Sequence, residues 1–240
     1  METRMKKVKK DNNILVIGDL HIPAQHADTL KFLKAVKAKF KPTKVILTGD
    51  EVNWQSISFH TKHPDLPSPR MELEICRQLL KPFYELFPKA DVLESNHGSL
   101  VFRKAIDAGL PTEIIKSYRE MLHAPKGWDW HFSMTVHTDL GPIYFHHGKS
   151  SSIEKLSKSM GMSALQGHYH SKFYVSYWAS PMGLFWDANA GSFADHKHLA
   201  MDWAKNTLSK SIHGVIVIQN GIPNLIPMVL NDDGKWNNKL

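Results

Sequence analysis

The segment Gly167-His168-Tyr169-His170 places two imidazole side chains two residues apart, directly after a short apolar run over residues 162–165. This order is typical of a β-strand that leads into a loop. Side chains i and i+2 of an extended segment point to the same side, so we expect His168 and His170 to face one cleft and Tyr169 to point elsewhere. The chain has 15 histidines among 240 residues, and the pair alone also fits two ordinary loop histidines.

Four segments upstream share the same form, in which a short apolar run ends in residues that can bind metal ions. They are Ile17-Gly18-Asp19-Leu20-His21, Leu47-Thr48-Gly49-Asp50-Glu51-Val52-Asn53, Glu94-Ser95-Asn96-His97-Gly98 and Phe145-His146-His147-Gly148. In an open α/β sheet, ligands bind outside the carboxyl ends of the strands. Strand ends that bring Asp, His and Asn side chains to one edge therefore predict a metal site.

This ordered set of segments resembles the calcineurin-like metallophosphoesterase superfamily, whose motifs are D-x-H, G-D-x-x-N/D, N-H, H-G and G-H-x-H. The resemblance spans residues 14–170 of the 240. Around Asn96 the sequence is also similar to small phage-encoded members. The resemblance implies an α/β fold, a two-sheet α/β sandwich of metallophosphoesterase type with flanking helices.

The resemblance also implies two metal ions that share Asp50. One ion would be held by Asp19, His21, Asp50 and His170, and the other by Asp50, Asn96, His147 and His168. His147 fits the H-G motif better than His146, because it directly precedes Gly148. Carboxylate, imidazole and amide donors without thiolate suit divalent transition metals, so we expect two divalent ions, Mn²⁺ first, with Fe²⁺, Zn²⁺, Ni²⁺ or Mg²⁺ as alternatives.

His97 is the candidate catalytic residue, because it directly follows Asn96 and its ring should lie over the pocket without binding a metal. A protonated imidazole there can donate to the leaving alkoxide, while metal-bound hydroxide would attack the phosphorus. Most members of the superfamily carry an acidic residue after this histidine, whereas this chain has Gly98. Either Asp65 or Asp19 would then steady His97, or the role is absent.

These motifs predict a metal-dependent phosphoric ester hydrolase, and we favour a phosphomonoesterase on nucleotides, that is, a nucleotidase. One alternative is a DNA or RNA phosphodiesterase or nuclease similar to repair exonucleases, and another is a metal-bound binding protein without turnover. The candidate substrate contacts are Asn53, Trp54, His146, Arg103 and Tyr169. The pocket wall should come from residues 53–69 and from the segment after His170, where Trp54, Phe59, Tyr169 and Phe173 could stack a base or simply pack in the core.

The composition is that of a globular protein, with 42% hydrophobic and 22% charged residues. A single cysteine, Cys76, excludes an intramolecular disulfide, and its helical context favours a buried thiol. The net charge of +7 favours a nucleotide or nucleic acid as the phosphate-ester partner, although several lysines lie in the N-terminal tail. The sequence has no apolar run of membrane-spanning length and no signal peptide, so we expect a cytoplasmic protein, in the host cytoplasm if it is phage-encoded.

We expect a basic flexible tail over residues 1–12, a single domain over residues 13–230 and a loose polar tail over residues 231–240. The pattern predicts helices over residues 27–40, 71–86 (kinked or broken at Pro82), 99–108 (capped by Ser99), 112–122 and 150–160. It predicts strands over residues 13–17, 45–47, 90–93, 128–138, 142–145, 173–178, 184–189, 214–219 and 224–230. The strands beyond His170 are expected to form the second sheet.

Overall fold

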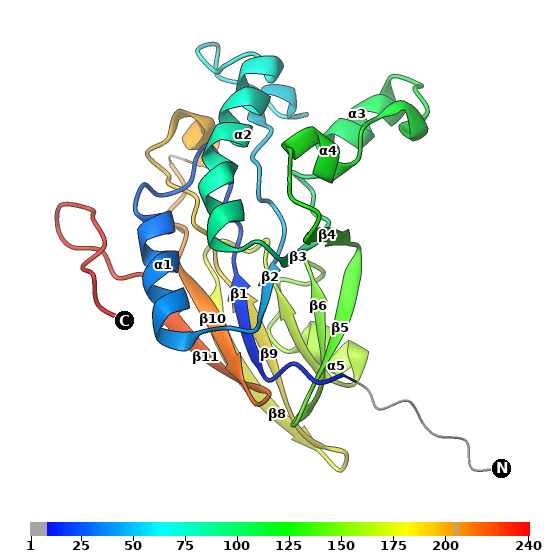
Figure 1. Ribbon diagram of the computed structural model, residues 1–240, viewed down its shortest axis with the longest axis vertical. Helices are drawn as coiled ribbons and strands as arrows, with labels where there is room; N and C mark the ends of the chain where they lie inside the picture. Colours follow the sequence, from blue (N-terminus) through cyan, green and yellow to red (C-terminus); the bar gives the residue numbers. More distant parts are fainter. Residues whose placement is uncertain (1–8, 205) are drawn as a thin grey trace.

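The computed structural model describes residues 9–204 and 206–240, so most of the basic N-terminal segment (residues 1–8) lies outside the described residues. The first of two sheets has the strand order β11-β10-β1-β2-β3-β4 (Figure 1). Its parallel strands are β1 (Asn13–Ile17), β2 (Lys44–Leu47), β3 (Ala90–Leu93) and β4 (Trp128–His131). Beyond β1 the sheet continues with antiparallel β10 (Gly214–Gln219) and β11 (Ile222–Pro227).

The second sheet has the strand order β5-β6-β7-β9-β8. It consists of β5 (Ser133–Thr138), β6 (Gly141–His146), β7 (Ser163–Gln166), β8 (Phe173–Ser180) and β9 (Gly183–Ala190). β6, β7 and β9 run parallel, and β5 and β8 pair antiparallel at the two edges. The predicted two-sheet α/β sandwich with flanking helices is therefore confirmed.

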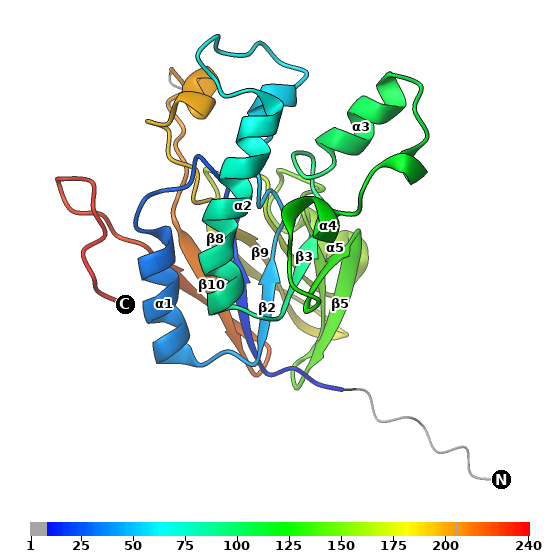
Figure 2. The ribbon, with the colours of Figure 1, turned by 45° about the horizontal axis from the view of Figure 1, so that its top comes forward.

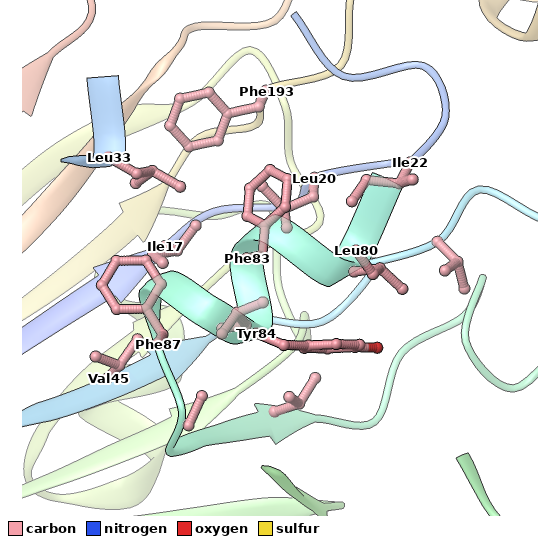
Figure 3. Close-up of a cluster of buried hydrophobic side chains, with 14 of the residues drawn as sticks. Ile17, Leu20, Ile22, Leu33, Val45, Leu80, Phe83, Tyr84, Phe87 and Phe193 are labelled. Carbon is pink, nitrogen blue, oxygen red and sulfur yellow. The ribbon is translucent and has the colours of Figure 1, made fainter. Parts of the chain in front are cut away.

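Strand β1 is buried on both faces, which explains its unbroken apolar sequence. Leu15 and Ile17 belong to the hydrophobic cluster that includes the helices on the outer face of the first sheet. Figure 3 shows Ile17 in this cluster with Phe83 and Phe87 of α2 and the loop that follows it. Ile14 and Val16 pack instead against the second sheet, where Trp186 is fully buried. Because successive side chains of a strand alternate in direction, one strand joins both hydrophobic clusters and fixes the position of its carboxyl end.

Helices cover both outer surfaces of the sandwich. Helices α1 (Thr29–Phe40), α2 (Pro69–Leu86) and α4 (Tyr118–Leu122) pack with the first sheet, and α5 (Lys155–Met160) contacts β7 and β9. Helix α3 (Leu100–Asp107) and the cyan loop before α2 lie at the end of the molecule to which the arrow of β2 points (Figure 2). Among the described residues, no helix has both the length and the apolar character needed to cross a membrane.

The predicted strand over residues 128–138 is wrong, because the chain changes sheets at Phe132. β4 pairs with β3 in the first sheet, whereas β5 pairs with β6 in the second. Alternation has the same period in both sheets, so the pattern does not mark the crossing; Phe132 itself is 63% exposed. The strands after residue 170 also divide between the sheets, because β10 and β11 extend the first one.

Two predicted helices are shorter than expected. Residues 112–122 form a 3₁₀ turn, η2 (Thr112–Ile114), and then α4, because Ser117 and Glu120 make a capping box that starts a new helix. Residues 150–160 are helical only in α5. Ser150 accepts the backbone N–H of Ser152 on its Oγ, a local turn that competes with the helix.

Two expected helix signals act differently from the prediction. α2 runs unbroken through Pro82, so the single missing backbone donor is tolerated on a helix that buries Leu80 and Phe83. Ser99 already has helical backbone angles, and its side chain does not cap α3. A capping side chain requires an extended backbone at that position.

Residues 231–240 pack against α1 through Trp236. This side chain is 4% exposed, and its ring meets Phe32 edge-on with the ring centroids 5.4 Å apart. The Trp236 backbone N–H donates to Asp28 Oδ2 over 2.9 Å. The segment that we expected to be loose therefore contributes a buried anchor.

We predict that Trp236→Ala lowers the free energy of unfolding by about 3–5 kcal/mol, because it empties a large buried site. Urea unfolding followed by circular dichroism measures this loss. Leu208→Ala is the matched control, because Leu208 is fully exposed and its truncation should leave stability unchanged. Equal unfolding midpoints for both variants would show that the C-terminal segment contributes nothing to the core.

Candidate metal centre

The ends of β1, β2, β6 and β7 bring Asp and His side chains together in two clusters. The first cluster consists of Asp19, His21, Asp50 and His170, and the second of Asp50, His147 and His168. Within each cluster, one potential ligand atom per residue lies within 4.8 Å of the others. Asp50 belongs to both clusters.

The backbone of these loops is held in a demanding conformation. His21, Asp50 and His168 have φ values of 54°, 47° and 68°, which side-chain-bearing residues rarely adopt. The Asp50 N–H donates to Ser95 Oγ over 2.9 Å. Gly167 leaves room for the site, because a Cβ there would collide with Asp19 Oδ1 and lie 2.5 Å from Thr48 Oγ1.

In the first cluster, His21 is held as a neutral ring with a free lone pair. Its Nδ1 donates to Asn53 Oδ1 over 2.9 Å, and its Nε2 lies 2.9 Å from His170 Nε2 and 3.5 Å from Asp50 Oδ2. Burial and the neighbouring charges of His170 and His97 lower the pKa of His21 to about 3. A neutral imidazole with one nitrogen fixed by a partner is the form that binds metals.

In the second cluster, two imidazole rings converge on one amide oxygen. His147 Nδ1 donates to the Thr48 carbonyl over 2.8 Å, which turns Nε2 toward the cluster. That Nε2 lies 2.7 Å from Asn96 Oδ1 and 3.4 Å from Asp50 Oδ2. His168 Nδ1 is 3.0 Å from the same Asn96 oxygen. A metal ion bound here would take the place of the proton on His147 Nε2, because a ligating imidazole has to be neutral.

The electrostatics of the centre favour positive charge. Asp50 Oδ1 accepts the His97 backbone N–H over 3.0 Å, whereas Oδ2 is buried and has no hydrogen-bond partner among the described residues. Burial alone would raise the pKa of Asp50, but His147 and His97 hold it well below the usual range. Burial likewise opposes the charge of His147, yet Asp50 and Asp19 raise the pKa of that ring to about 9. The residues present therefore fit divalent cations bound by oxygen and nitrogen.

His97 lies beside the clusters and lines a cavity of about 790 Å³. Its Nδ1 donates to the backbone carbonyl of Asn53, and its ring meets His21 edge-on at 4.7 Å between centroids. Neither of the two expected carboxylates is hydrogen-bonded to His97. Asp65 is exposed beside His63, and Asp19 accepts hydrogen bonds from Thr48 Oγ1 and the His168 backbone N–H. A backbone carbonyl therefore orients the ring.

Of the five predicted substrate contacts, one lines the cavity and the other four lie elsewhere. Arg103 lines the cavity and donates from Nη2 to the Asn96 carbonyl. Asn53 is fully buried and serves His21 and His97, and Trp54 packs in the hydrophobic core. Among the described residues, neither His146 nor Tyr169 lines the cavity.

Sequence reasoning missed several residues that support the centre. Thr48 Oγ1 donates to Asp19 Oδ1 over 2.7 Å, and Ser95 Oγ accepts the N–H groups of Asp50 and Gly98. Both lie inside motif segments, so their position was a usable signal. Asn189 Nδ2 donates to the Gly167 carbonyl over 2.8 Å, and no motif marks this residue.

Sequence reasoning also missed two further features around the centre, although Glu51 lies inside a motif segment. Glu51 is buried, and burial raises its pKa to about 7, while Trp130 donates to its Oε1. Part of the cavity wall comes from the chain after β9, through His196, Ser209, Lys210 and Ser211. These residues reach the site because the Ile212 N–H donates to the His170 carbonyl over 2.9 Å.

A two-sheet α/β sandwich whose strand ends gather Asp and His side chains defines the metallophosphoesterase class. The calcineurin-like phosphoesterase family matches residues 13–163, and the chain belongs to this family. The match ends before Gly167, so His168 and His170 complete the site from outside it.

Comparison with curated proteins found no match. Among solved structures, Vps29 from Chaetomium thermophilum has 14% identity and a TM-score of 0.48, covering 94% of this chain and 93% of its own. The phosphoesterase YfcE from E. coli has 12% identity and a TM-score of 0.46, covering 95% and 98%. Nuclease MPE from Pseudomonas putida has 15% identity and a TM-score of 0.33, covering 89% and 85%. Identities and TM-scores this low carry no information about the chemistry of the site.

We predict that Asp50→Asn reduces the metal content from two divalent ions per chain to less than one, because both clusters lose the shared carboxylate. Elemental analysis after Mn²⁺ loading and gel filtration measures the content. Asp65→Asn is the matched control, since that carboxylate is 79% exposed and outside the clusters. Wild-type metal content in folded Asp50→Asn would rule out a shared ligand.

Proposed function

We propose that this chain is a dinuclear-metal-dependent phosphoesterase, and more specifically a phosphomonoesterase that acts on nucleotides. The observation that carries the proposal is the buried carboxylate of Asp50. Its Oδ2 accepts no hydrogen bond from the described residues, and it faces His21 Nε2 at 3.5 Å and His147 Nε2 at 3.4 Å. A carboxylate that faces ligands of two clusters is what a pair of ions requires. Family membership supports the same reaction class.

The proposed ligands are those predicted from the sequence. Asp19, His21, Asp50 and His170 would hold one ion, and Asp50, Asn96, His147 and His168 the other. When bound, two divalent ions supply Lewis acidity, which activates water and neutralises charge that develops on the phosphoryl oxygens. The donor set favours Mn²⁺, with Fe²⁺, Zn²⁺, Ni²⁺ or Mg²⁺ as alternatives.

His97 is the proposed general acid. With Nδ1–H engaged by the Asn53 carbonyl, Nε2 is the nitrogen that can carry a second proton and deliver it to the leaving oxygen. The ring lines the cavity and lies against His21, which supports a role beside the bound phosphoryl group. The Asn53 carbonyl holds the ring in this orientation.

Arg103 and Lys210 both line the cavity and provide positive charge for the substrate. A nucleoside monophosphate needs such cations around its dianionic phosphate. The same pair also suits flanking phosphates of a DNA or RNA strand, which keeps a phosphodiesterase or nuclease as the second candidate.

A metal-supplemented substrate panel tests the function. It contains nitrophenyl phosphate, bis-nitrophenyl phosphate, nucleoside monophosphates, cyclic nucleotides, a phosphopeptide, and single- and double-stranded DNA. We expect nucleoside monophosphates to give the highest kcat/KM. Faster turnover of bis-nitrophenyl phosphate together with DNA cleavage would replace the monoesterase with the diesterase, and no turnover on any ester would reject both.

We predict that His97→Ala keeps the metal content and lowers kcat on a nucleoside monophosphate by about 10²–10⁴-fold, because general acid catalysis is lost. The loss should be much smaller on nitrophenyl phosphate, whose leaving group needs little protonation. His60→Ala is the control, since His60 lines the same cavity and has no proposed role. Equal losses on both substrates would exclude proton donation by His97.

A further inference from the structure

Phe59 is a large apolar side chain that lies 49% exposed at the cavity of the metal centre. It follows the 3₁₀ turn η1 (Gln55–Ile57), in the loop that precedes α2. Burying a phenylalanine side chain is favourable, yet about half of Phe59 remains in contact with solvent. Among the described residues that line the cavity, Phe59 is the sole phenylalanine, tyrosine or tryptophan.

Two cations of α3 hold the Phe59 ring. Lys104 Nζ lies 3.6 Å from the ring centroid, and Arg103 Cζ lies 5.4 Å from it. Cations over an aromatic face are attracted by its electron density. Arg103 also donates to the Asn96 carbonyl, so the ring is connected through one side chain to a proposed metal ligand.

The base of the loop is fixed by a buried carboxylate. Glu72, 2% exposed in the first turn of α2, accepts the backbone N–H of Gln55 over 3.0 Å and of Ser56 over 2.9 Å. Ser58 is buried, and its Oγ accepts the His60 N–H over 3.1 Å. The loop thus presents Phe59 from a supported backbone, as a preorganised binding surface requires.

We propose that Phe59, held by Lys104 and Arg103, is the surface on which the nucleobase of the substrate stacks, so that the site selects nucleoside phosphates over base-free phosphate esters. This inference rests on the proposed phosphoesterase function. A nucleoside phosphate combines a flat aromatic base with an anionic phosphate. The cavity offers the matching pair, an exposed ring with cations beside it and a metal centre.

The other aromatic side chains predicted to stack a base do not compete for this role. Trp54 is 4% exposed in the hydrophobic core, and Phe173 packs against the cluster between the sheets. Neither they nor Tyr169 line the cavity as the structure describes it. The specificity for a base therefore depends on Phe59.

AMP and ribose 5-phosphate form a sharp test, because they share the phosphate and the leaving ribose oxygen and differ in the base. Phe59→Ala should lower the ratio of kcat/KM for AMP over ribose 5-phosphate by roughly 5- to 150-fold, the range that base–aromatic stacking supplies. Phe59→Trp should restore the ratio. Phe132→Ala is the matched control, since Phe132 is 63% exposed under Lys149 and lies outside the cavity lining.

Three outcomes would overturn the inference. An unchanged ratio in Phe59→Ala would show that the ring does not contact the base. An equal loss of kcat/KM on both esters would give Phe59 a structural role. With phenyl phosphate as a third substrate, a loss confined to that ester would assign the ring to an aryl group. Binding provides a readout independent of turnover: AMP, but not ribose 5-phosphate, should quench the additional emission of Phe59→Trp relative to wild type. If the wild type hydrolyses no ester yet this quenching occurs, the proposed function fails and the base site stands.

Discussion

The structure depends on a buried carboxylate, Asp50, that is 1% exposed and leaves one oxygen without a hydrogen bond among the described residues. Burying a charge is costly unless a partner compensates it. The surrounding chain supplies that compensation: three strand ends bring His21, His147 and the His97 backbone N–H to it. The fold therefore holds an anionic oxygen between two imidazole rings, an arrangement that fits a cation.

The hydrophobic packing explains how this point is held. β1 and β2 are buried on both faces, so neither can shift without disturbing one of the two clusters that contain Leu15 and Ile14. Their carboxyl ends carry Asp19 and Asp50 into the site. Rigid strands fix the positions, and the loops add side chains with unusual backbone angles, such as His168. The sheets supply the packing that holds His21, Asp50 and His168 in these backbone conformations.

Much of the candidate site could be located because each proposed ligand follows a continuous apolar strand in an ordered set of short motifs. Asp19, Asp50 and His147 could be read from such segments. The crossing between β4 and β5 could not, since alternating residues look alike in either sheet. The hydrogen-bond acceptor of His97 could not be predicted either, because a backbone carbonyl has no sequence signature. The residues after β9 that line the cavity reach it through tertiary contacts alone.

Asn53 connects a proposed metal ligand, His21, with the candidate acid, His97, through hydrogen bonds to both rings. Its side-chain oxygen accepts from His21 Nδ1, and its backbone carbonyl accepts from His97 Nδ1. Each interaction fixes which nitrogen of its ring stays available. The two rings meet edge-on at 4.7 Å, so one buried residue sets the tautomer of a proposed ligand and the orientation of the proposed acid. This arrangement accounts for a histidine without the usual following carboxylate, because the backbone of the preceding motif supplies the acceptor that Gly98 cannot.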